Sequence, residues 1–86
     1  MTLEIVTPGG TRSVADCTSI RLYTSAGTPG WVGFRNGCAR TAVVLSAGKV
    51  AAYRNDSCVF AANCDGVATA EDDGVTLLTD GFEETG

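Results

Sequence analysis

The sequence contains no histidine and few basic residues, and each shortage excludes a class of function. Its 86 residues include six basic and ten acidic side chains, giving a net charge of −4. Without histidine there is no histidine-based triad or general base. The basic residues are scattered, whereas nucleic-acid binding needs a basic patch. No phosphate-binding G-x-x-x-x-G-K-[ST] motif is present. We therefore expect no enzymatic activity, no cofactor and no nucleic-acid partner.

Long apolar runs are also missing. None approaches the ~20 residues that span a bilayer. The first residues, 1–7, lack a basic region and include Glu4 in their short apolar run, unlike a secretory signal peptide. We therefore expect an intracellular protein with reduced thiols. The cysteine spacings include no C-x₂-C or C-x₄-C pair, so neither a disulfide nor a zinc site is expected. The four cysteines are Cys17, Cys38, Cys58 and Cys64.

Helical periodicity is absent too, and period-2 alternation recurs instead. Leu3 and Ile5 alternate with polar residues, as do Ile20 and Leu22. Strands this short and frequent predict an all-β antiparallel sandwich or barrel. The residues predicted to lie largely inside are Leu3, Ile5, Ile20, Leu22, Val43, Leu45, Val50, Val59, Val67, Val75 and Leu77.

Turn residues separate the predicted strands. Pro8-Gly9-Gly10 suits a type II turn, Arg54-Asn55-Asp56-Ser57 a polar hairpin loop, and Asp72-Asp73-Gly74 a tight hairpin. The unevenly spaced glycines between Gly27 and Gly48 indicate a loop that crosses from one set of strands to another, at positions needing positive φ or close packing. We expect the domain to span residues 1–80, with an acidic tail at 81–86.

The single tryptophan, Trp31, lies between glycines and has two interpretations. It is either a core residue or an exposed anchor for a protein partner. Cys38 lies between Arg35 and Arg40, whose charges could lower a thiol pKa, so a thiol-dependent enzyme is a further alternative.

Several motifs in order resemble the N-terminal domain of the epsilon subunit of F-type ATP synthases, called delta in mitochondria. The resemblance runs without a gap from about Ser25 to Asp80 and covers nearly the whole chain when the first strand is included. Departures around Trp31, Cys38 and Asp65 indicate a divergent or alternate-type member. The motifs are Leu3-Glu-Ile-Val-Thr-Pro8, Gly27-x-x-Gly30-x-x-Gly33-Phe34-x-x-Gly37-x-Ala39, Gly48-Lys-Val50, Gly66-Val67 and Gly74-Val-Thr-Leu-Leu-Thr-Asp80.

The resemblance implies a β-sandwich of about ten short strands in the central stalk of a rotary motor, peripheral to the membrane. It implies the gamma subunit and the c-subunit ring as partners in proton- or sodium-driven ATP synthesis. It places the protein on the cytoplasmic side of the inner membrane, or on the matrix side in a mitochondrion. Thr28, Trp31 and Arg35 would contact the c ring, and Cys38, Arg40 and Ala42 would face gamma. The alternative is a free-standing sandwich that binds a peptide or small ligand through the Trp31 loop.

Overall fold

The computed structural model describes residues 1–25, 27, 29–37 and 39–85, which form ten strands and no helix. Accordingly, the described chain has no helix long and apolar enough to cross a membrane. The strands are β1 (Thr2–Thr7), β2 (Gly10–Val14), β3 (Ser19–Thr24), β4 (Gly30–Phe34), β5 (Thr41–Leu45), β6 (Lys49–Arg54), β7 (Ser57–Cys64), β8 (Gly66–Glu71), β9 (Gly74–Leu78) and β10 (Phe82–Glu84).

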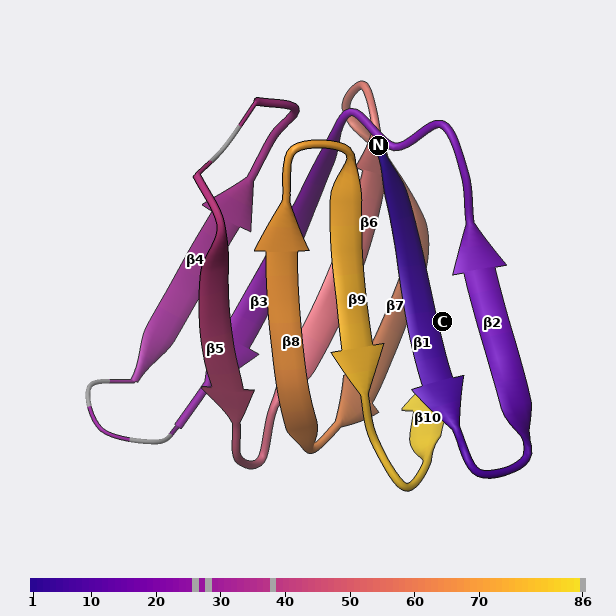
Figure 1. Ribbon diagram of the computed structural model, residues 1–86, viewed down its shortest axis with the longest axis vertical. Coiled ribbons are helices and arrows are strands. Elements are labelled where there is room, and N and C mark those ends of the chain that lie inside the picture. The colour runs from indigo at the N-terminus through magenta and orange to yellow at the C-terminus, as the bar shows by residue number, and fades with distance from the viewer. Residues whose placement is uncertain (26, 28, 38, 86) are drawn as a thin grey trace.

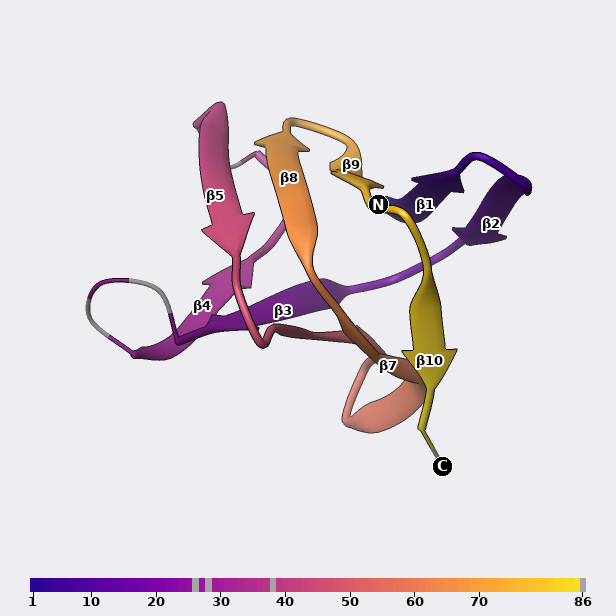
Figure 2. The ribbon, with the colours of Figure 1, turned by 90° about the horizontal axis from the view of Figure 1, so that it is seen from below.

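The strands build two five-stranded sheets that pack face to face (Figures 1 and 2). Sheet A has the order β2-β1-β9-β8-β5, and sheet B has the order β10-β7-β6-β3-β4. The predicted all-β sandwich is therefore confirmed. One pairing departs from the antiparallel pattern, because β1 runs parallel to β9. The N-terminal strand thus joins the β1–β2 hairpin to the β8–β9 hairpin within one sheet.

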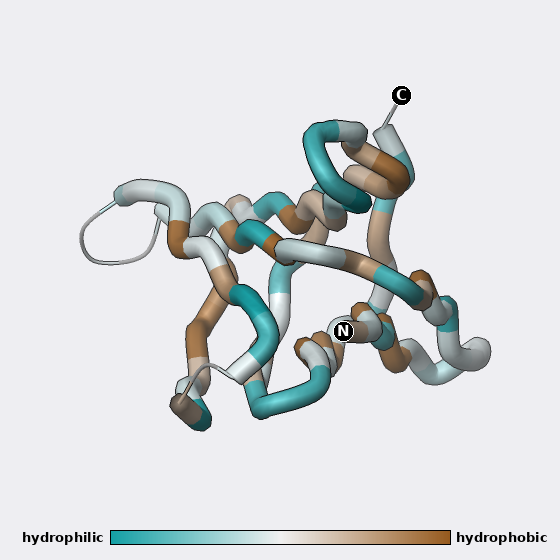
Figure 3. Tube along the Cα trace, turned by 90° about the horizontal axis from the view of Figure 1, so that it is seen from above, coloured by the Kyte–Doolittle hydropathy of each residue, from teal (hydrophilic) through white to brown (hydrophobic). Residues whose placement is uncertain are grey.

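The core lies between the two sheets and is built by alternation along the strands (Figure 3). Most predicted core residues are buried, namely Leu3, Ile5, Ile20, Leu22, Leu45, Val50, Val75 and Leu77. Val43 is half-buried and packs against them.

Two core predictions are wrong, because Val59 and Val67 are 38% and 43% exposed. In β7, a bulge interrupts the pairing with β6, and Phe60 points inward instead of its neighbour Val59. In β8, the small Ala68 and Ala70 fill the core, so Val67 points outward. Both strands have apolar residues next to one another, and alternation then cannot identify the inner face.

Two predicted hairpins are confirmed. β6 and β7 are joined through Asn55 and Asp56, with Asn55 at a φ of 58°. β8 and β9 are joined by the turn just before Gly74. Gly74 does not have a positive φ, so the turn conformation does not explain why this position is a glycine. A Cβ at Gly74 would overlap the backbone of Thr2, its partner on β1. The glycine is therefore required by close backbone approach in the parallel pair.

The type II turn after β1 is not observed. A type II turn with Pro8 in its second position needs positive φ at Gly9, whereas the positive φ, 142°, occurs at Gly10. The crossing predicted between Gly27 and Gly48 is observed, but two strands lie within this stretch. β4 belongs to sheet B and β5 to sheet A, so residues 35–40 carry the chain between the sheets.

β2 is an edge strand of sheet A and β10 is an edge strand of sheet B, and one arginine connects the two. Arg12 on β2 lies 5.0 Å from the centre of the Phe60 ring and pairs with Glu84 on β10 at 3.1 Å. Phe82 packs against the core and stands edge-to-face to Phe60. The segment 81–86, predicted as a tail, thus contributes a strand of sheet B, and the sandwich extends past the boundary predicted at residue 80.

Candidate functional site

The outer face of sheet A carries an apolar row across four strands. Val44 on β5 lies opposite Val67 on β8, which lies opposite Leu78 on β9. Leu78 in turn lies opposite Val6 on β1, and these strands are neighbours in Figure 1. Val44 and Leu78 are 62% and 57% exposed. Single exposed apolar residues are ordinary, but a contiguous row is typical of a protein contact surface.

The residues predicted to face gamma lie beside this row. Ala42 is exposed on the outer face of β5, two residues before Val44 and therefore on the same side. Arg40 precedes β5 and pairs with Glu71 on β8 at 3.3 Å, with both side chains largely in solvent. Such an exposed ion pair adds about 0–1 kcal/mol to stability, so it orients Arg40 more than it holds the fold. Cys38 lies outside the described residues.

The outer face of sheet B has a different chemistry, with aromatic and cationic side chains in register. Trp31 on β4 lies opposite Tyr23 on β3, and their ring centres are 5.4 Å apart. Tyr23 lies opposite Lys49 on β6, whose Nζ is 5.9 Å from the Tyr23 ring centre. Two residues along β3, the Arg21 guanidinium lies 4.7 Å from the centre of the Tyr53 ring. Three aromatic rings and two cations therefore lie together on three adjacent strands.

Trp31 and Arg35, predicted as c-ring contacts, belong to this second face. Trp31 is 54% exposed, so its interpretation as a core residue is wrong, and it lies in a strand rather than in a loop. The buried aromatic residue of β4 is Phe34, on the opposite face of the strand. Arg35 shares a shallow hollow with Ser19, Arg21 and Gly33. Thr28 lies outside the described residues. Of the described residues, those predicted to contact the c ring thus lie on or beside sheet B, and those predicted to face gamma lie on or beside sheet A.

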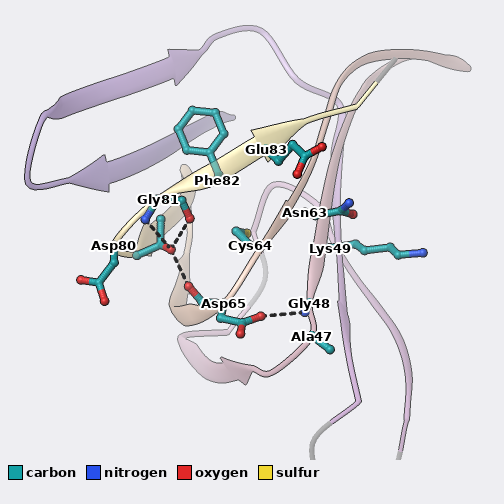
Figure 4. A pocket seen from close by; sticks show the side chains of 11 residues that line it. Ala47, Gly48, Lys49, Asn63, Cys64, Asp65, Asp80, Gly81, Phe82 and Glu83 are labelled. Atoms are coloured by element: carbon teal, nitrogen blue, oxygen red, sulfur yellow. Dashed lines mark hydrogen bonds between the residues drawn. The ribbon is translucent and has the colours of Figure 1, made fainter.

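A groove lies at one end of the sandwich, lined by residues of the turns after β5, β7 and β9 (Figure 4). Two of its polar side chains bind the protein itself. Asp65 Oδ1 accepts a hydrogen bond from the Gly48 amide at 3.1 Å, and the Thr79 hydroxyl lies between the carbonyl oxygens of Asp65 and Gly81. These bonds connect the turns after β5, β7 and β9. The Asp65 and Thr79 side chains of the groove therefore hold these turns together.

The described cysteines are free thiols with different surroundings: Cys17 and Cys64 are buried and Cys58 is exposed. Burial, followed by the charge of Asp65, raises the pKa of the Cys64 thiol to about 11. A thiol with this pKa stays protonated at neutral pH and is a poor nucleophile. The thiol-enzyme alternative placed its nucleophile at Cys38, outside the described residues. Among the residues described, no cluster of acidic or thiol groups could hold a metal ion.

Sequence reasoning missed most of the two faces. It did not single out Val6, Val67 or Leu78 as a surface, or Tyr23 and Lys49 as neighbours of Trp31. One signal was present: adjacent apolar residues interrupt the alternation in each of the four strands that carry the row. These doublets are Ile5-Val6, Val43-Val44, Val67-Ala68 and Leu77-Leu78. No protein-family model and no curated protein matches the chain.

Proposed function

We propose that this chain is a non-catalytic central-stalk subunit of a rotary F-type ATP synthase. It would link the gamma subunit to the c-subunit ring during proton- or sodium-driven ATP synthesis. It would sit peripherally at the cytoplasmic side of the inner membrane, or at the matrix side in a mitochondrion. The proposal rests on the resemblance of the chain's motifs and is supported by the ten-stranded sandwich and its two distinct outer faces.

The apolar row on sheet A is the structural observation that most supports a contact with gamma. Val6, Val44, Val67 and Leu78 stand in one line across four hydrogen-bonded strands. Burying a Val or Leu side chain fully contributes about 1.5–3 kcal/mol. Since these side chains are already partly covered, docking would gain roughly half of that for each. The row therefore supplies several kcal/mol of contact energy, and we assign it to gamma because Arg40 and Ala42 adjoin it.

The opposite face suits a second partner. Trp31 and Tyr23 present rigid aromatic surface, which costs little conformational entropy on binding. The two sheets between the faces are each cross-linked by ladder hydrogen bonds and share one packed core. Such a body transmits force between two partners with little deformation. We assign this face to the c ring.

Reconstitution with the gamma subunit of the same organism tests the proposal. We expect the purified chain to form a stable complex with gamma in gel filtration. Leu78→Asp places a charge in the middle of the row and should weaken binding at least tenfold, because a buried unpaired carboxylate is costly. Asn55→Asp adds the same charge at the exposed β6–β7 turn and should bind like the wild type.

Failure of the wild-type chain to bind gamma would refute the assignment. It would favour the free-standing binding module instead. Equal weakening by Leu78→Asp and Asn55→Asp would mean that net charge, not the apolar row, governs the contact. Circular dichroism of both variants checks that the fold is retained.

A further inference from the structure

Three of the six basic residues gather on the outer face of sheet B. Arg21 and Lys49 lie on β3 and β6, and Arg35 follows β4 beside Arg21. Within the described ranges, no carboxylate forms an ion pair with any of the three. The other three basic residues bind oxygen atoms of the protein: Arg12 binds Glu84, Arg40 binds Glu71, and Arg54 donates to the backbone carbonyls of Ala15 and Asp16.

The spacing of Arg21 and Lys49 is set by the sheet. Arg21 lies opposite Ala51, and Lys49 is two residues from Ala51 on the same strand. Arg21 and Lys49 are therefore diagonal neighbours, about 7–8 Å apart at their backbone positions. In an extended chain, residues i and i+2 point to the same side and lie roughly 7 Å apart. A pair of carboxylates at i and i+2 thus matches the backbone spacing of Arg21 and Lys49.

The rest of the face fits an extended segment. Gly33, Arg21, Ala51 and Ala61 form one row across the sheet, so the residues beside Arg21 on the neighbouring strands are small. Trp31 and Tyr23 in the neighbouring row offer aromatic surface to the segment. Their row ends on β10 at Glu83, whose charge disfavours a carboxylate at that end. The part of sheet B that favours an acidic segment is therefore the half formed by β4, β3 and β6.

We propose that this half of sheet B binds an extended acidic loop of a partner protein, with carboxylates two residues apart on Arg21 and Lys49. A long polyanion is disfavoured, because the chain carries a net charge of −4 and Glu83 lies at the end of the Trp31–Tyr23–Lys49 row. A short segment needs only the local cations, in charge-assisted hydrogen bonds.

Synthetic peptides in a Gly/Ser background test the inference. One contains Glu-x-Glu, a second Gln-x-Gln, and a third two adjacent glutamates. Backbone amide NMR titration, with fluorescence of the single tryptophan as a second readout, reports binding at Kd values of about 1 mM or tighter. We expect Glu-x-Glu to shift the signals of β3, β4 and β6, and to bind at least tenfold more tightly than Gln-x-Gln. Adjacent glutamates point to opposite sides of an extended chain and should bind more weakly.

Charge-removing variants locate the contact. Arg21→Gln and Lys49→Gln should each weaken Glu-x-Glu binding about three- to tenfold, whereas Arg54→Gln at the far hairpin removes the same charge without effect. Equal binding of the three peptides, or no shift with Glu-x-Glu, would overturn the inference. So would an oligothymidine or anionic vesicles that bind the same strands as tightly. Gamma binding without acidic-peptide binding would overturn this inference alone, and the reverse result would overturn only the proposed function.

Discussion

Replacing Trp31 with alanine should separate a surface role from a structural one, since the two predict different losses of stability. Trp31 is 54% exposed, and its main described ring contact is Tyr23, 5.4 Å away between centres. A tryptophan buries up to ~250 Å², so this one buries roughly 100 Å². At about 25 cal/mol per Å² that is about 2.5 kcal/mol, which is an upper bound. Because alanine keeps part of this contact, we expect a loss of about 1–2 kcal/mol.

Phe34 provides the matched control on the same strand. It is 6% exposed and points into the core, so Phe34→Ala should cost about 3–5 kcal/mol. Urea unfolding followed by far-ultraviolet circular dichroism measures both variants without relying on the tryptophan. A Trp31→Ala loss as large as that of Phe34→Ala would refute the assignment of Trp31 to the outer surface.

The same variant has a second readout in assembly. If Trp31 is an anchor for the c ring, Trp31→Ala should weaken assembly by about 1–3 kcal/mol, the usual range for an interface hot spot. Titration of the variant against the isolated ring, beside the wild type, gives this number. Unchanged affinity with reduced stability would leave Trp31 with a structural role only.

Two further predictions concern stability. Because the folded chain raises the pKa of the Cys64 thiol from 9.0 to about 11, the folded state keeps a proton that the unfolded state releases between these values. The free energy of unfolding should therefore fall by about 2 kcal/mol from pH 9 to pH 11, and urea titrations of Cys64→Ala should lack this part of the decline. Gly74→Ala should cost about 3 kcal/mol in the same assay, since a Cβ would overlap the Thr2 backbone, whereas Gly30→Ala has open space and should cost far less.

The fold class could be predicted from the sequence because most strands alternate clearly. Leu3 and Ile5 are separated by a charged residue, and so are Ile20 and Leu22, which fixes the inner face of each strand. The parallel pairing of β1 with β9 could not be predicted, because it joins residues more than seventy positions apart and leaves no local pattern. Its only trace is Gly74, whose missing side chain makes room for the first strand.

The candidate surfaces depend on register, which one sequence does not give. The sequence shows the apolar doublets Ile5-Val6 and Leu77-Leu78. It does not show which residue of each doublet faces outward, or that the outward residues lie in one line. A slip of one residue between β8 and β9 would move Leu78 into the core and break the row. The parallel pair holds this register: Leu78 lies opposite Val6 only while Gly74 lies opposite Thr2. The close approach at Gly74 therefore supports the outer row as well as the core, and a variant that shifts this register should lose gamma binding together with stability.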